Sequence, residues 1–111
     1  MKKMSITYKN RVYDLVFNLN VIDEIQKKYG TLNKWVELTE GEEPNAEAVK
    51  FGFTHMINEG IDIFNEDNND NIPFMSEKQV ARLITDLGLQ EISEKMQDTV
   101  INSVDTGEEK N

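Results

Sequence analysis

The segment that decides the fold spans residues 45–64 and reads NAEAVKFGFTHMINEGIDIF. Its apolar residues recur at i, i+3, i+4 and i+7, which is the spacing of one face of an α-helix. The sequence therefore predicts a long helix that begins after Asn45 and carries a core-facing stripe, made of Val49, Phe53, Met56, Ile57, Gly60, Ile61 and Phe64. Gly52 and Gly60 each lower helix propensity by about 1 kcal/mol relative to Ala, so close packing, a bend or an early end near Gly60 is expected.

The residues before this long helix predict a β-hairpin. Residues 5–9 and 12–17 are rich in β-branched and aromatic side chains and flank Asn10, a residue type that tolerates positive φ. We expect the hairpin to span about residues 5–17. A lone hairpin is marginal in water, so it must pack against the helices or join strands of another chain.

Residues 18–30 carry the start and stop signals of a helix. We expect Asn20 to cap its start and Gly30 to end it, and an acidic pair early in the segment and a lysine pair late in it suit the helix dipole. Thr31 then opens a short helix through Leu38. The apolar positions that cover the hairpin are Val21, Ile22, Ile25 and Tyr29.

The residues after the long helix predict a loop and two more helices. Residues 65–73 favour a loop, because short Asn and Asp side chains compete for backbone hydrogen bonds and Pro73 blocks a helix. Ser76 and Gln79 form a capping box, and Gly88 ends the helix that they open. The last helix is expected to turn Leu89, Ile92, Met96 and Val100 to the core, and Ser93, Glu94, Lys95, Gln97 and Asp98 to water.

The predicted fold is mainly α with a small N-terminal β-hairpin, an α+β domain of four to five helices. The 111 residues fit a single helical domain, which we place at residues 1–104, and residues 105–111 are expected to form a disordered acidic tail. The sequence contains no cysteine, so packing alone must hold the fold, as suits a reducing cytoplasm. Neither a signal peptide nor a membrane span is predicted.

The formal net charge of −9 repels phosphate backbones and anionic lipid surfaces, so neither nucleic acid nor a membrane is an expected partner. The charge is unevenly distributed. Residues 1–36 carry seven basic and three acidic side chains, whereas residues 37–111 carry five and eighteen. Either this polarity orients the protein on a partner or on a copy of itself, or the acidic part is a solvated face that aids solubility.

The residue patterns needed for catalysis or metal binding do not occur in the sequence. His55 is the only histidine, and no motif places a nucleophile beside it, so we interpret it as a residue at the edge of the core. No glycine-rich phosphate-binding loop occurs. The loop that begins at Asp67 fails as a calcium site, because Ile72 stands where the turn needs glycine and Lys78 where a bidentate Glu is needed. The sequence thus predicts a protein that is not an enzyme and needs no cofactor.

Several short motifs begin in the second strand of the predicted hairpin and continue after it. They are YDLVFNLN at residues 13–20, IDEI at 22–25, KYG at 28–30, Leu32, and Trp35-Val36. The later half adds a long helix, an insert, a helix capped by Ser-Glu and a restart at GLQE, residues 88–91. This layout, over about residues 5–103, resembles the tail assembly chaperones of long-tailed bacteriophages and of prophages of Gram-positive hosts.

The resemblance implies a protein that binds the tape-measure protein, keeps this long helical chain soluble, and helps tail-tube subunits polymerise around it. It also implies that the protein acts in the cytoplasm of the bacterial host and is absent from the mature virion. Several copies would bind one client, and these copies could form a homo-oligomer. Such a role needs a groove or apolar patch that accepts an amphipathic helix. The alternatives are a small acidic phage-encoded inhibitor that mimics DNA, and a structural tail component.

The residues predicted to bind a partner are Phe51, Phe74, Met75 and Trp35. Phe51 lies off the apolar stripe, and Phe74 and Met75 lie on the loop before the fourth helix. Each has an alternative place in the core. Phe51 would pack against the short helix, Phe74 would act as a hydrophobic staple on Val80, and Trp35 would be a core residue.

Overall fold

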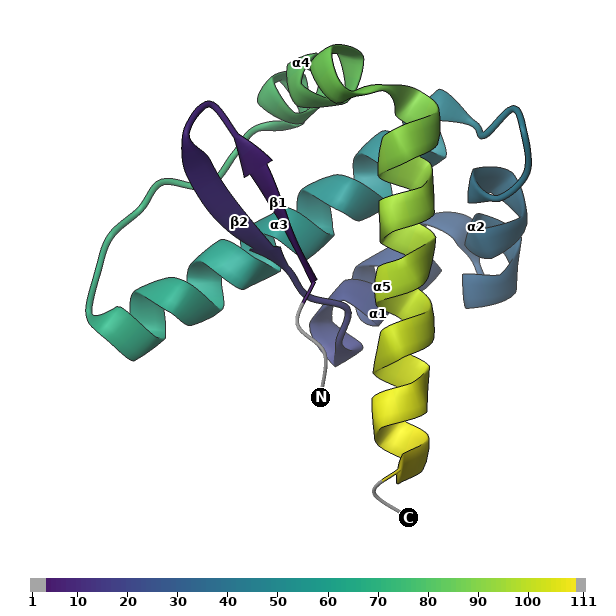
Figure 1. Ribbon diagram of the computed structural model, residues 1–111. Helices are drawn as coiled ribbons and strands as arrows, with labels where there is room; N and C mark the ends of the chain where they lie inside the picture. The colour runs from purple at the N-terminus through teal and green to yellow at the C-terminus, as the bar shows by residue number, and fades with distance from the viewer. Residues whose placement is uncertain (1–3, 110–111) are drawn as a thin grey trace.

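The computed structural model describes residues 4–109, and for residues 104–109 the backbone alone is described. The chain forms a hairpin of β1 (Met4–Tyr8) and β2 (Arg11–Leu15), followed by α1 (Leu19–Tyr29), α2 (Leu32–Thr39), α3 (Ala46–Asn68), α4 (Glu77–Leu87) and α5 (Leu89–Glu109) (Figure 1). This arrangement confirms the predicted fold class, mainly α with a small N-terminal hairpin.

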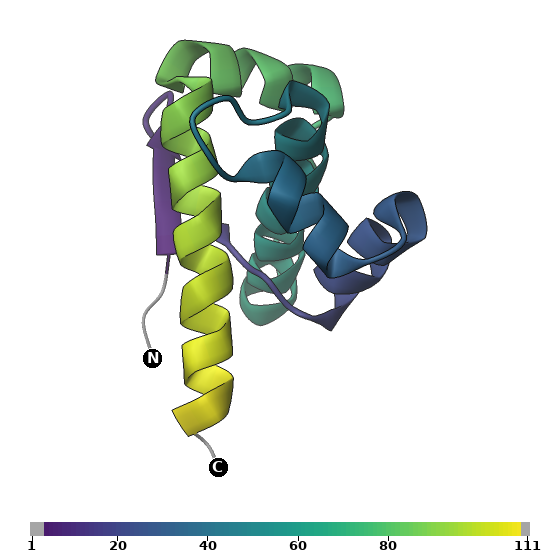
Figure 2. The ribbon, with the colours of Figure 1, turned by 90° about the vertical axis from the view of Figure 1, so that its right-hand side faces the viewer.

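α3 is the central helix, and β2, α1, α2, α4 and α5 all contact it. The hairpin and the pair α1–α2 lie on opposite sides of α5, and α4 closes one end of the molecule (Figure 2). The predicted stripe of α3 is buried from Val49 to Ile61. Phe64 is the exception, because its side chain is 41% exposed. The C-terminal end of α3, which includes Phe64, projects past β2, so the neighbouring elements cover it only in part (Figure 1).

The end of α3 also differs from the prediction. The helix runs through Gly60 and continues to Asn68, so four of the residues expected in a loop are helical. Asn69 ends the helix in the left-handed conformation, with φ 53°. Asn tolerates this conformation better than most residues, because its short side chain can hydrogen-bond locally.

The hairpin packs against the helices, which is one of the two alternatives left open by the sequence. Its turn residues, Lys9 and Asn10, have φ of 51° and 67°, as in the tight turns whose twist matches that of the strands. The N–H of Val16 donates to the Met56 carbonyl at 3.2 Å, which ties the chain after β2 to α3. At the other end, the Tyr8 hydroxyl donates to Oδ2 of Asp86 in α4 at 2.5 Å, and this hydrogen bond raises the pKa of Tyr8.

Two glycines of α3 allow neighbouring groups to approach the helix closely. A Cβ atom added at Gly60 would lie 2.2 Å from the carbonyl oxygen of Asp14 in β2. One added at Gly52 would lie 2.3 Å from Cζ2 of Trp35 in α2. Close packing is therefore the reason that both glycines are accommodated inside this helix.

Most of the predicted helix caps are confirmed, but the first is displaced by two residues. The side chain of Asn18, not that of Asn20, accepts the Val21 N–H and caps α1. Asn20 lies inside the helix, where its amide donates to Glu59 at 2.9 Å. The caps that agree with the prediction are Gly30, Thr31, Asn45, the Ser76–Gln79 capping box and Gly88.

Two residues of α5 that were predicted to face water instead hold the end of α2. Ser93 is 3% exposed, and its hydroxyl donates to the carbonyl of Thr39. Nε2 of Gln97 donates to Oγ1 of the same threonine at 2.7 Å. The last carbonyls of a helix have no partner within the helix, and here the Ser93 hydroxyl satisfies that of Thr39.

The ends of the chain bear on two further predictions. Of the predicted tail, residues 105–111, the backbone is helical through Glu109, and residues 110 and 111 lie outside the described part of the chain. Disorder of this tail stays a prediction. Within residues 4–109, no helix combines the length and the apolar character needed to cross a bilayer.

Candidate functional site

Trp35, one of the four residues predicted to bind a partner, lies in the core. Its side chain is fully buried, and its indole N–H donates to the Ala48 carbonyl at 2.9 Å. The ring stacks on Phe17 with 6.4 Å between the ring centroids. Because no part of this ring reaches the surface, the core alternative for Trp35 is the one observed.

Phe51 lies on α3 at the edge of the core, where it contacts the end of α1 and not the predicted short helix. Its ring contacts those of Tyr29 and His55, with centroid distances of 5.7 and 4.6 Å, and the Lys28 ammonium lies 5.0 Å from its centroid. The Tyr29 hydroxyl is buried without a hydrogen-bond partner among the described residues. Burial raises the pKa of Tyr29, and the nearby carboxylate of Glu47 raises it to a smaller extent. Phe51 is thus a half-buried member of an aromatic cluster and not a free surface residue.

Two asparagines of α3 fix the connection between α3 and α4. Asn65 exchanges two hydrogen bonds of 3.0 Å with the backbone of Ile72, one as donor and one as acceptor. Asn58 does the same with the backbone of Met75, at 2.9 and 2.8 Å. Each amide pairs with both backbone groups of one residue, as a neighbouring β-strand would. We call these two pairs the asparagine clamps.

The clamps hold the backbone on either side of Phe74, and the side chains of Phe74 and Met75 differ in exposure. Phe74 lies between the two clamped residues and is 57% exposed. Met75 is half-buried against the core. Met75 directly precedes the Ser76 cap, so it occupies the position of a hydrophobic staple, and the predicted staple at Phe74 is wrong. Of the four predicted residues, Phe74 is therefore the one that offers a large exposed apolar side chain.

The surroundings of Phe51 and Phe74 predict that substitution by serine lowers the stability of the protein at Phe51 but not at Phe74. Phe51→Ser is expected to cost about 1–3 kcal/mol of stability, because it removes a ring packed against the core, and each kcal/mol lowers Tm by roughly 4–8 °C in a domain of this size. Phe74→Ser should leave Tm nearly unchanged. Thermal melts followed by circular dichroism test both. A wild-type Tm for Phe51→Ser would place its ring in the solvated surface instead.

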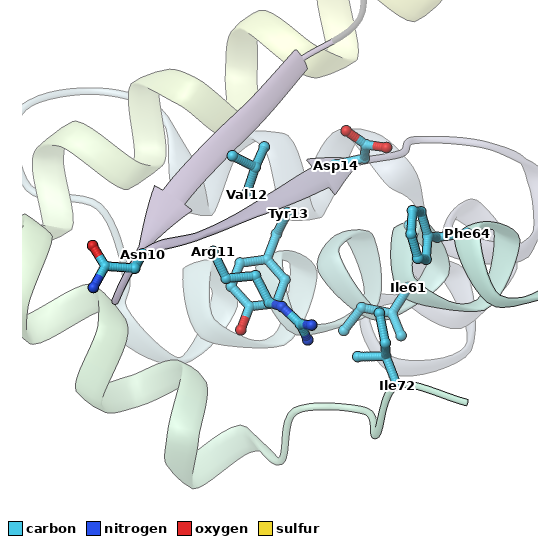
Figure 3. A pocket seen from close by; sticks show the side chains of 9 residues that line it. Asn10, Arg11, Val12, Tyr13, Asp14, Ile61, Phe64 and Ile72 are labelled. Carbon is cyan, nitrogen blue, oxygen red and sulfur yellow. The ribbon is translucent and has the colours of Figure 1, made fainter. Parts of the chain in front are cut away.

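An open groove of about 300 Å³ lies between β2 and the C-terminal half of α3 (Figure 3). Arg11 and Tyr13 extend into it from β2, on the side that faces α3 (Figure 3). Ile61 and Phe64 of α3 line the opposite wall, together with Ile72 of the clamped connection. Gly60 forms the floor where β2 crosses α3. We call this site the β2–α3 groove.

The β2–α3 groove lies beside an acidic part of the chain. Residues 51–77 include six acidic side chains and no Lys or Arg. Asp67 and Asp70, at the projecting end of α3 and in the turn after it, form no ion pair with another described residue. Arg11 is the only basic residue in the lining of the groove, and it likewise has no ion pair within residues 4–109.

A second hollow, of about 330 Å³, lies between the turn at Gly41 and α5, and its lining is polar. Its carboxylates belong to Glu40, Glu94 and Asp98. Across the described residues, no group of three or more His, Cys, Asp or Glu side chains is arranged to hold a metal ion. Apolar side chains, which a protein partner would need, are found in the β2–α3 groove and not here.

Comparisons with known protein families, with curated proteins and with solved structures found no match to this chain. The proposal below is therefore supported by the sequence motifs quoted above and by the geometry of the β2–α3 groove.

Proposed function

We propose that the protein is a tail assembly chaperone of a long-tailed bacteriophage or prophage, which binds helical segments of the tape-measure protein in the β2–α3 groove. The observation that carries the proposal is an open groove with apolar side chains from three separate segments, Tyr13, Ile61 with Phe64, and Ile72. An amphipathic helix is the ligand that this composition suits, because it presents apolar anchors on one face. Its backbone is hydrogen-bonded internally and needs few polar partners in the groove.

Exposed apolar side chains lie in the groove and next to it. On the projecting end of α3, Ile63 and Phe64 are 36% and 41% exposed, and Val12 on β2 is 63% exposed. Large exposed apolar side chains close to a groove are typical of surfaces that bind other proteins. A client helix seated in the groove would cover Phe64, whereas Val12 points to the other face of β2 (Figure 3).

The proposed role involves several copies of the protein on one client. A tape-measure protein is much longer than a single small domain, so each copy would bind one segment, and linked weak contacts would hold the assembly together. The acidic surface would keep the loaded client soluble. In this role the tail-tube protein is a second partner. The protein would act in the host cytoplasm and would be absent from the finished virion.

A small acidic inhibitor that mimics DNA is the second candidate, and the acidic residues 51–77 favour it. Such a protein presents carboxylates in place of phosphates. The β2–α3 groove favours the chaperone, because a DNA mimic has no use for an apolar groove. A structural tail component, the third alternative, would be found in many copies when purified particles are examined by mass spectrometry, whereas a chaperone would be absent.

Co-expression with a fragment of a candidate tape-measure protein tests the proposal. We expect the soluble fraction of the fragment to rise several-fold with the wild-type protein. Phe64→Ser should abolish most of this rise, while Ile101→Ser, which changes a 55% exposed residue of α5 that does not line the groove, should retain it. If the wild-type protein leaves the fragment insoluble, the chaperone role is wrong.

A further inference from the structure

We infer that the segment bound in the β2–α3 groove is a basic amphipathic helix, in which a Lys or Arg lies about one helical turn from the apolar anchor residue. The inference rests on the proposed function and adds the chemistry of the client to it. It comes from the distribution of charge around the groove, which differs between its two walls.

The acidic side of the groove lies along α3. Gly60, Phe64 and Asp67 follow one another at i, i+4 and i+7, so they share one face of the helix. The first two line the groove, and Asp67 therefore continues the same line of side chains toward the projecting end of α3. Asp70 lies just beyond, in the turn where its N–H donates to the Asn65 carbonyl at 3.0 Å.

The helix end adds negative charge at the same place. The C-terminus of a helix carries a partial negative charge, which basic side chains in the last turn commonly offset. The last turn of α3 contains no basic residue. Asp67 and Asp70 thus stand at the negative end of the helix dipole with no ion pair among the described residues. A cation supplied by a partner would be attracted to this end of the groove.

Arg11 gives the opposite wall the opposite charge. It extends into the groove from β2, whereas Asp14, the other charged residue of the lining, turns its carboxylate to the opposite side of the strand (Figure 3). A cation on the flank of the client that faces β2 would therefore be repelled. The complementary helix therefore places its Lys or Arg toward the end of α3 and a neutral or acidic residue toward β2. This asymmetry would also fix the direction in which the helix lies, because reversing the helix would bring like charges together.

The probes for this inference are three synthetic helical peptides of about 20 residues with identical apolar faces. One carries Lys one helical turn from the central Phe, one carries Glu at that position, and one carries Gln. Fluorescence anisotropy at low salt measures the Kd of each with the full chain. We expect the Lys peptide to bind about tenfold more tightly than the Glu peptide, and the difference to shrink at high salt, where exposed charges are screened. Equal affinities of the Lys and Glu peptides would overturn the inference.

A matched pair of variants separates the local charges from the net charge of −9. The double variant Asp67→Asn/Asp70→Asn should weaken binding of the Lys peptide about three- to tenfold. The control, Glu94→Gln/Asp98→Asn, removes the same charge from the polar hollow beside α5 and should change the affinity by less than about twofold. An equal loss in both variants would overturn the inference, since the net charge alone would then be responsible.

The same measurements separate this inference from the proposed function. If the client fragment becomes soluble in co-expression while the Lys and Glu peptides bind equally, the charge inference fails and the chaperone role stands. If the Lys peptide binds selectively while the client stays insoluble, the groove is a site for basic helices and the chaperone role fails.

Discussion

Replacing Gly60 by alanine is expected to displace the hairpin from α3 and to destabilise the protein by about 1–3 kcal/mol. The new Cβ would lie 2.2 Å from the carbonyl oxygen of Asp14 and 3.0 Å from its carbonyl carbon. Both are backbone atoms, so no side-chain rotation relieves the clash, and β2 itself must move. Overpacking of this kind costs about 1–3 kcal/mol or more. Loss of the Val16–Met56 hydrogen bond adds about 1 kcal/mol, against about 1 kcal/mol gained in helix propensity.

Denaturant unfolding measures the loss, and hydrogen exchange locates it. Amides of β1 and β2 should exchange faster in Gly60→Ala, while those of α5 should change less. Glu66→Ala is the control, because it introduces alanine at an exposed position of the same helix. Since the floor of the β2–α3 groove is formed at this crossing, peptide binding should weaken as well. If Gly60→Ala were as stable as the wild type, β2 would not be constrained by its contact with α3.

Gly52→Ala is expected to destabilise the protein by about 3 kcal/mol. The added Cβ would lie 2.3 Å from Cζ2, 2.8 Å from Cε2 and 2.9 Å from Nε1 of Trp35. The indole is fully buried, so it has no free space into which it can move. A shift that relieves the clash would break its hydrogen bond to the Ala48 carbonyl. A buried donor left without a partner costs about 1–3 kcal/mol in addition to the overpacking.

A double-mutant cycle tests whether Trp35 is the source of this effect. Trp35→Phe removes the outer part of the indole and should by itself destabilise the protein, because it leaves a cavity. Combined with Gly52→Ala, the smaller ring leaves room for the new methyl group, so the double variant should be more stable than the sum of the two losses predicts, by at least about 1 kcal/mol. Strictly additive free energies of unfolding would show that the two positions do not interact.

The local parts of the fold could be predicted from the sequence because their signals are local. A capping residue, a helix-ending glycine or a two-residue turn acts within a few positions of the chain, and these predictions were confirmed at Thr31, Asn45, Ser76 and Gly88. The prediction of Asn20 as the cap of α1, where Asn18 is observed, failed for a related reason. Both residues are able to cap, and the decision depends on the backbone, which is extended at Asn18 with φ −135°.

The errors concern how far one element extends along another. Helical spacing assigns Phe64 to the same face as Ile61, but it carries no information on where β2 stops covering α3. The hydroxyl of Ser93 bonds to a carbonyl 54 positions earlier in the chain, and such a contact produces no periodic pattern. Both features depend on contacts between residues that are far apart in the sequence, and neither a helix cap nor a hydrophobic stripe indicates such contacts.

The candidate site was harder to predict than the fold. Sequence reasoning selected apolar residues that lay outside the helical stripes, and they proved to be spread from the core, at Trp35, to the surface, at Phe74. The β2–α3 groove instead combines a strand, a helix and a connection. These meet through a close contact at Gly60 and a side-chain clamp at Asn65, neither of which is visible in the spacing of apolar residues.

The asparagine clamps require a stretch of α3 and a stretch of the connection to have the same length. Asn58 and Asn65 are seven residues apart on a helix, a rise of about 10 Å. Their partners, Met75 and Ile72, are three residues apart on an extended segment, which also spans about 10 Å. A residue inserted between Ile72 and Met75 would put the two lengths out of step and release one clamp, whereas one inserted in the turn between Asn69 and Asn71 would leave both lengths equal. The connection therefore has one part whose length is fixed by α3 and one part in which the chain is free to vary.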